Sequence, residues 1–170
     1  AVLAARLHHR EVFARLAPGL DVAAAERAAP FRITHEDFFD DALPALDTLV
    51  AAGFQVAVAA NQPEVTEAIL VARGLPLAFA LSSERAGVAK PDPAFFAEVG
   101  KACGVPSERI AYVGDRIDND VLPANTAGML SVFTPRGPWG RLHATWPQAA
   151  QAALTVEKLT DLPEALQARV

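Results

Sequence analysis

Short apolar runs alternate with longer segments of mixed polarity through most of this chain of 170 residues. Each run is closed by polar residues or glycine, which predicts buried strands. The predicted strands lie at 54–60, 77–81, 110–113 and 129–133. Amphipathic segments predict helices over 41–52, 63–73, 92–103 and 118–127, and a last strand and helix are expected within 156–170. Alternating strands and helices predict an α/β fold in which helices cover both faces of a parallel sheet.

The first 33 residues have a different, helical pattern. Residues 1–16 are rich in Ala, Leu and Arg, and Pro18-Gly19 interrupts the pattern. Asp21 is predicted to cap a second short helix that reaches Ala29 and is ended by Pro30. The sequence therefore predicts two regions, a helical segment at 1–33 and an α/β core at 34–170.

Composition excludes several classes of protein. The net charge of −5 and the pI near 5.3 argue against a nucleic-acid binder, which usually carries a basic surface. The single cysteine, Cys103, excludes a disulfide framework. No apolar run is long enough to cross a membrane and no secretory signal pattern opens the chain, so a cytoplasmic protein is expected. The pattern leaves the oligomeric state open.

In open parallel sheets, ligands bind beyond the carboxyl ends of the strands. The residues that follow the four predicted strands are Asn61, Ser82-Ser83, Asp115 and Thr134. Asp120 comes five residues after Asp115, in the first turn of the next predicted helix. Two carboxylates at this edge suit Mg²⁺, which takes one or two carboxylates together with phosphate oxygens. The alternative is that acidic residues here only favour the start of a helix.

Lys90 lies in a second segment with chemical potential. Pro91 keeps Lys90 extended, Asp92 is suited to cap the following helix and Pro93 to begin it. The amino end of a helix attracts anions, so Lys90 is placed to contact a phosphoryl oxygen. The alternative is a solvated surface lysine.

Taken together, Lys90-Pro91-Asp92-Pro93, Gly114-Asp115 with Asp120, and the run 120–129 resemble the third and fourth motifs of haloacid dehalogenase-like (HAD) hydrolases, in the same order and spacing. The likeness covers about residues 34–170. It implies a three-layer Rossmann-like core with a parallel sheet and a partial helical cap at 1–33. It also implies an Mg²⁺-dependent phosphatase that acts on a small phosphorylated metabolite, since the metal acids favour a phosphatase over a dehalogenase.

The resemblance assigns roles to individual residues. Lys90 matches the lysine that neutralises phosphoryl charge, and Asp115 and Asp120 match the metal-binding acids. Ala60 and Asn61 stand at the second motif, which binds the phosphoryl group. Ala60 occupies the place of a Ser or Thr, so one hydrogen-bond donor is lost there.

No predicted strand leads directly into the first motif, an aspartate nucleophile followed by Asp two residues later. In the family its strand lies between those predicted here at 54–60 and 110–113. Without it, buried backbone groups would lack partners. We therefore expect this strand in the intact protein, before Ala1 or otherwise outside residues 1–170.

Two other functions stay open. A catalytically inactive HAD-like domain would bind a phosphorylated ligand or a protein partner without turnover, and Ala60 favours this reading. An unrelated doubly wound binding domain would use Asp115 and Asp120 only as helix-start residues. Trp139 is expected to pack in its loop, and His143 is isolated in the sequence and receives no role.

Overall fold

The computed structural model describes residues 17–28 and 32–169, and the chain forms two compact units, Ala1–Thr34 and His35–Val170. In the first unit, helix α2 (Val22–Ala28) begins where predicted, because an Asp21 carboxylate oxygen accepts a hydrogen bond from the Ala24 N–H at 2.9 Å. The helix predicted over 1–16 lies outside the described residues. Within the described residues, no helix combines the length and apolarity needed to cross a membrane.

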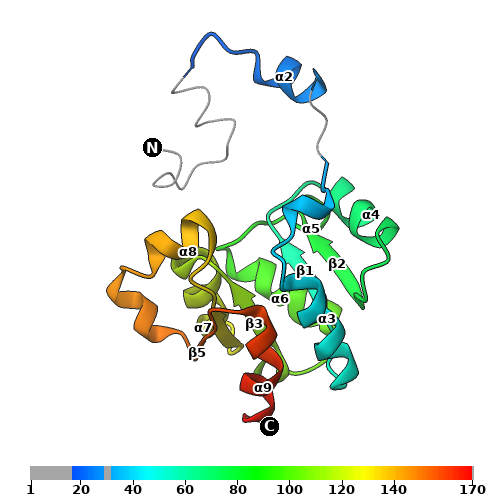
Figure 1. The fold of residues 1–170 in the computed structure, drawn as a ribbon. Coiled ribbons are helices and arrows are strands. Elements are labelled where there is room, and N and C mark those ends of the chain that lie inside the picture. Colours follow the sequence, from blue (N-terminus) through cyan, green and yellow to red (C-terminus); the bar gives the residue numbers. More distant parts are fainter. Residues whose placement is uncertain (1–16, 29–31, 170) are drawn as a thin grey trace. The chain divides into compact units, whose positions relative to one another are not determined.

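The second unit alternates strands and helices as predicted (Figure 1). Its strands are β1 (Ala57–Ala60), β2 (Phe79–Ser82), β3 (Ala111–Gly114), β4 (Leu130–Phe133) and β5 (Leu154–Thr155). Its α-helices are α3 (Ala42–Ala51), α4 (Val65–Ala72), α5 (Ser83–Ala86), α6 (Pro93–Cys103), α7 (Leu122–Thr126), α8 (Gly137–His143) and α9 (Leu162–Gln167). Short 3₁₀ turns cover His35–Asp37, Ser107–Arg109, Pro147–Gln151 and Leu159–Asp161, and η4 (Ile117–Val121) is a π-helical turn.

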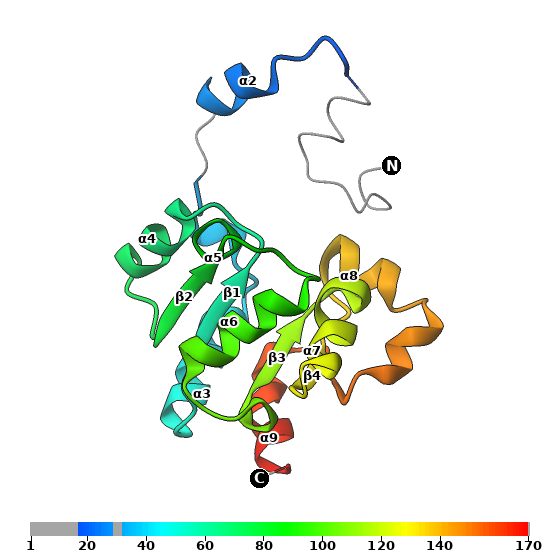
Figure 2. The same ribbon diagram turned by 180° about the vertical axis from the view of Figure 1, so that it is seen from behind.

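The strands form two parallel sheets, β1–β2 and β3–β4–β5. In both views β1 lies on the side of its sheet nearer to β3 (Figures 1 and 2). The Tyr112 hydroxyl donates to the Ala59 carbonyl at 3.0 Å and so links the two sheets. In the described part of the chain, β1 pairs only with β2, and β3 only with β4. The facing edges of β1 and β3 therefore run beside one another without backbone hydrogen bonds between them. The family resemblance implied a further strand at this place.

Helices cover both faces of these sheets and make three layers, which confirms the predicted fold class. On one face α6 and α7 pack against β3 through Phe96, Tyr112 and Ala124 (Figure 2). On the other face α3 and α9 pack against β4 through Leu49, Val132 and Leu162 (Figure 1). The carboxyl ends of the strands are left outside these two apolar clusters.

Several boundaries differ from the prediction. The second strand covers Phe79–Ser82 rather than 77–81, and Trp139, expected in a loop, lies in helix α8. The helix predicted over 118–127 is divided into η4 and α7, because Pro123 has no N–H to donate and the Val121 N–H bonds to the Arg116 carbonyl five residues back. The first strand begins at Ala57 rather than Phe54, since the Phe54 N–H closes the turn after α3 by bonding to the Leu49 carbonyl. The last strand, β5, precedes the predicted range and ends at Thr155.

Candidate functional site

The carboxyl ends of β1 and β3 bring the predicted site residues together. Asn61 directly follows β1, and its side-chain amide forms two hydrogen bonds with the backbone of Lys90. Nδ2 donates to the Lys90 carbonyl at 2.9 Å, and Oδ1 accepts from the Lys90 N–H at 2.8 Å. Both polar atoms of the amide thus hold the lysine loop in place. The Asp92 side chain caps α6 at the Ala94 N–H, as predicted, and Gly104 ends that helix in the left-handed conformation.

The side chain of Lys90 reaches Asp120. The ammonium nitrogen lies 2.5 Å from Asp120 Oδ1, and the two side chains are only 11% and 4% exposed. Burial acts to lower the pKa of Lys90, but the Asp120 carboxylate and Tyr112 more than offset this and raise it above its ordinary value. Lys90 is therefore a cation at neutral pH. Its ammonium group also lies 5.5 Å from the centre of the Tyr112 ring.

Asp115, which follows β3, lies close enough to Asp120 for the two carboxylates to interact. Burial, and next the charge of Asp120, raise the pKa of the Asp115 carboxyl group above its ordinary value. A cation between such acids would favour their ionised forms. Asp120 is held in place from a second side, because its Oδ2 accepts the Arg116 N–H at 3.0 Å.

The donor chemistry fits Mg²⁺, which commonly binds one or two protein carboxylates and takes its other ligands from water and phosphate. Over residues 17–28 and 32–169, no group of three or more His, Cys, Asp or Glu side chains is arranged to hold a metal. Asp115 and Asp120 could hold such an ion as two of its ligands, and water and phosphate oxygens would supply the others.

Gly114 has a packing role beside this pair. A Cβ built on Gly114 would come closer than 3.0 Å to three atoms of the Asp120 side chain. Any larger residue would displace Asp120 or the strand end. The glycine before Asp115 therefore allows the strand to pass directly against the second acid.

Ser82 was one of the residues predicted to follow a strand and so to lie near a ligand. In the structure it belongs instead to a cluster with Glu67 and Arg85. Glu67 of α4 accepts the Ser82 N–H at 2.8 Å and the Ser82 hydroxyl at 2.6 Å, and pairs with Arg85 at 2.6 Å. Burial acts to raise the pKa of Glu67, but the bonds from Ser82 and Arg85 lower it below its ordinary value. The cluster joins α4 to the end of β2.

The segment that joins β4 to α8 and the first residue of α8 approach Asp115 from another side. Gly137 has a left-handed φ of 64°, and a Cβ there would lie 3.9 Å from both Asp115 Oδ2 and the Phe39 ring. The Arg136 guanidinium group covers the Phe39 ring at 4.0 Å and pairs with Asp41 at 2.8 Å. Sequence reasoning missed this group, because its members are distant in the chain and belong to no recognised motif.

Thr134, at the end of β4, was one of the strand-end residues. Its hydroxyl oxygen is buried and has no hydrogen-bond partner, although such groups usually find one. His143, to which the pattern assigned no role, is buried beside η4.

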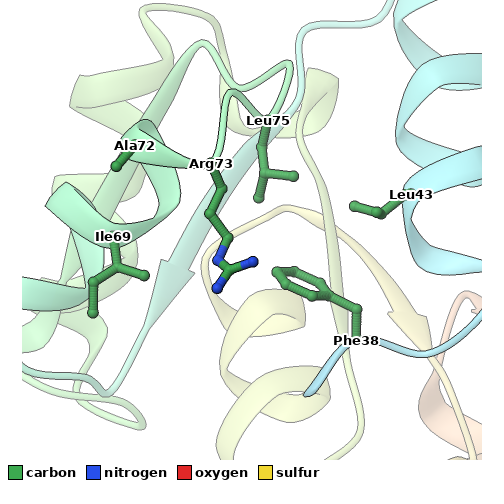
Figure 3. A pocket seen from close by; sticks show the side chains of 6 residues that line it. All are labelled: Phe38, Leu43, Ile69, Ala72, Arg73 and Leu75. Carbon is green, nitrogen blue, oxygen red and sulfur yellow. The ribbon is translucent and has the colours of Figure 1, made fainter. Parts of the chain in front are cut away.

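A separate hollow of about 500 Å³ lies between α3, the segment before it, and α4 (Figure 3). Figure 3 shows the guanidinium group of Arg73 pointing toward the Phe38 ring, with aliphatic side chains around them. The lining residues are Phe38, Leu43, Ile69, Ala72, Arg73 and Leu75. None of them is a predicted site residue and none supplies a carboxylate, so this hollow offers no metal-binding or nucleophilic group.

Comparison with known proteins agrees with this geometry. The family model of haloacid dehalogenase-like hydrolases matches residues 3–128. The chain is 32% identical over 133 residues to haloacid dehalogenase-like hydrolase domain-containing protein 3 of Danio rerio, covering 77% of this chain and 53% of that one. It is also 32% identical over 133 residues to the glyceraldehyde 3-phosphate phosphatase of Methanopyrus kandleri, covering 76% and 57%.

Among solved structures, the fold superposes on a HAD phosphatase from Thermococcus onnurineus with a TM-score of 0.68 and 21% identity, over 92% of this chain and 69% of that one. The chain spans little more than half the length of the two curated relatives. The matched residues include Asn61, Lys90, Asp115 and Asp120. By its family match and its three-layer fold, the chain belongs to the haloacid dehalogenase-like hydrolases.

Proposed function

We propose that the intact protein is an Mg²⁺-dependent phosphatase that acts on a small phosphorylated metabolite. The observation that carries the proposal is the buried Lys90–Asp120 pair beside Asp115, at the carboxyl edge of the parallel strands. The similarity to the glyceraldehyde 3-phosphate phosphatase of Methanopyrus kandleri supports the same class of reaction. A cytoplasmic location stays a prediction from the sequence.

The charges at this edge suit phosphoryl transfer, which depends on positioning and on neutralising the phosphoryl oxygens. In the proposal the Lys90 ammonium group contacts a phosphoryl oxygen, while the Asn61 amide keeps the lysine backbone fixed. Asp115 and Asp120 hold Mg²⁺, which when bound supplies further positive charge to those oxygens. Lys90 lies beside Asp120, so its positive charge and that of the ion would act at neighbouring positions.

The nucleophile is proposed to lie on an additional strand between β1 and β3. Within residues 17–28 and 32–169, both strands lack a ladder partner on the sides that run beside one another, and a strand there would satisfy these backbone groups. Inserted parallel to its neighbours, it would deliver its carboxyl end next to Lys90 and Asp115. The family resemblance places an aspartate at that end.

The reaction then has two steps. A carboxylate oxygen of the proposed aspartate forms a bond to phosphorus while the bond from phosphorus to the substrate oxygen breaks. That oxygen takes a proton from the second aspartate, which the family resemblance places two residues after the first, and leaves as the alcohol. Water then attacks phosphorus, gives a proton back to the second aspartate, releases inorganic phosphate and restores the first carboxylate. The covalent step divides one difficult displacement into two easier ones.

Ala60 supports a second candidate function, an inactive domain that binds a phosphorylated ligand or a protein partner. The position at the end of β1 has only a methyl side chain, where the family uses a hydroxyl donor. Backbone N–H groups and Lys90 would still attract phosphate. This candidate predicts binding of Mg²⁺ and phosphate without turnover.

The test measures release of inorganic phosphate by the intact protein from a panel of small phosphate monoesters, with Mg²⁺ and with excess chelator. Turnover that needs Mg²⁺ is expected, and Asp115→Asn should reduce it on the order of 100-fold. Asp47→Asn is the matched control, because it likewise replaces a carboxylate by an amide, at an exposed position of α3. Binding of phosphate and Mg²⁺ with no turnover of any ester would overturn the phosphatase and support the inactive binding domain.

A further inference from the structure

His143, the last residue of α8, makes a specific contact with the segment between the two acids. Its side chain is 1% exposed, and its Nδ1 accepts the Ile117 N–H at 2.9 Å. Ile117 is the first residue of η4, where the opening N–H groups of a helical turn have no partner inside the turn. The imidazole therefore supplies an acceptor for a buried backbone donor midway between Asp115 and Asp120.

The imidazole ring is held in one orientation by two tryptophans. Trp146 stacks on it with ring centres 3.9 Å apart and an angle of 18°, and Trp139 meets it edge-on at 5.8 Å. The Arg116 guanidinium group lies over Trp139 at 4.3 Å. The stacked Trp146 ring resists tilting of the imidazole out of its plane.

The surroundings of His143 tie it to the acids' own loop. Arg116 forms two bonds to Asp118, at 3.0 and 2.8 Å, and Asp118 Oδ1 lies 3.7 Å from His143 Nδ1. The backbone N–H of Arg116 in turn donates to Asp120 Oδ2. Two consecutive backbone donors thus have fixed partners: the Arg116 N–H bonds to Asp120 and the Ile117 N–H bonds to His143.

We propose that His143 is a positioning residue: by accepting the Ile117 N–H it holds the turn between Asp115 and Asp120 in the conformation that presents both carboxylates to Mg²⁺. The inference rests on the proposed function in one respect, that the ion binds at these acids. His143 touches neither the ion nor the substrate in this scheme. Its partners Trp139 and Trp146 maintain the direction of the acceptor.

Because Nδ1 accepts a hydrogen bond, it carries no proton, and the neutral ring must carry its proton on Nε2. This tautomer has a distinct nitrogen-15 NMR signature that does not depend on catalysis. We expect the intact protein to show His143 with a protonated Nε2 and an Ile117 amide that exchanges slowly with solvent. A proton on Nδ1 in the neutral ring would overturn the inference directly.

Two substitutions separate positioning from packing. His143→Phe keeps an aromatic ring between the tryptophans but removes the acceptor, whereas His143→Asn loses the ring and places Oδ1 where Nδ1 stood. Titration calorimetry with Mg²⁺ should show about a 10-fold or greater loss of affinity for the Phe variant, the range found for residues that orient metal ligands. The Asn variant should recover most of that loss despite lower thermal stability. Arg141→Ala, on the exposed side of α8, is the control.

The outcomes distinguish this inference from the proposed function. Equal Mg²⁺ affinity in the Phe variant and the unaltered protein would overturn the positioning role. If the unaltered protein does not bind Mg²⁺, the proposed function fails. The rate of amide exchange at Ile117 then tests separately whether His143 holds the turn. Fast exchange in the Phe variant with slow exchange in the Asn variant supports the role of His143, and unchanged exchange in the Phe variant overturns it.

Discussion

The ammonium nitrogen of Lys90 lies 2.5 Å from a carboxylate oxygen of Asp120, although the two residues are 30 positions apart in the chain. The contact joins the loop before α6 to the π-helical turn η4. Both side chains are withdrawn from solvent, so each charge depends on the other for compensation.

Lys90→Met should therefore lower the free energy of unfolding by about 3 kcal/mol, because it leaves the buried Asp120 carboxylate without its partner. Adding Asp120→Asn should restore much of this loss. Urea unfolding of the two single variants and the double variant measures the coupling. Lys101→Met, which breaks the exposed pair between Lys101 and Glu98, should cost less than about 1 kcal/mol. Additive losses in the double variant would contradict the prediction.

Gly114→Ala should weaken Mg²⁺ binding by about 10-fold, since the added methyl group would collide with Asp120 and move its carboxylate. Titration calorimetry with Mg²⁺ checks the effect. Gly100→Ala is the matched control, because a Cβ at that place in α6 meets nothing within 4 Å. The control should keep the affinity and gain up to about 1 kcal/mol of stability, as alanine favours a helix interior. Equal Mg²⁺ affinities for the two variants would contradict the predicted collision between residue 114 and the Asp120 side chain.

Ala60→Ser should raise kcat/KM of the intact protein for a phosphate monoester by about 10-fold or more, because it restores a hydroxyl donor at the end of β1. Steady-state phosphate release gives the comparison. Ala51→Ser, on an exposed position of α3, makes the same change away from the site. An Ala60→Ser variant no faster than the unaltered protein would show that phosphoryl binding does not use this position.

Glu67 should make stability depend on acid pH. Its bonds from Ser82 and Arg85 outweigh burial and lower its folded-state pKa below 4.5, the ordinary value for glutamate. A depressed carboxyl pKa gives stability that is complete above the unfolded value and is lost as pH falls through the folded value. The free energy of unfolding should therefore decrease as the pH is lowered below about 4.5. Glu67→Gln should make this decrease smaller. Exposed Glu157→Gln is the control. An identical acid dependence for Glu67→Gln and the unaltered protein would refute the assignment.

Much of the fold and the centre of the site could be predicted, because their signals are local in the sequence. Gly104 after α6 and the Asp92–Pro93 cap mark the ends of one helix within a dozen residues. The rule that ligands meet the carboxyl ends of strands gathered Asn61 and Asp115 without any coordinates. Such patterns depend on neighbouring residues and hold wherever the segment lies.

The supporting residues could not be predicted, since only tertiary structure brings them to the site. Arg136 reaches Asp41 across 95 positions, and His143 meets Ile117 across 26. Neither pair has a spacing that repeats or a motif that marks it. The π-helical turn was also missed, because the acidic residues in 118–120 are equally compatible with an ordinary helix start.

The facing edges of β1 and β3 also affect how the protein behaves in solution. Each edge offers backbone donors and acceptors in the spacing of a strand, so it is a template for any extended chain of suitable polarity. Molecules in which that space is unfilled would associate with one another as concentration rises, while molecules in which it is filled would stay dispersed. The size distribution of the particles in solution would therefore show whether the sheet is complete. The helix content of the two forms would differ little.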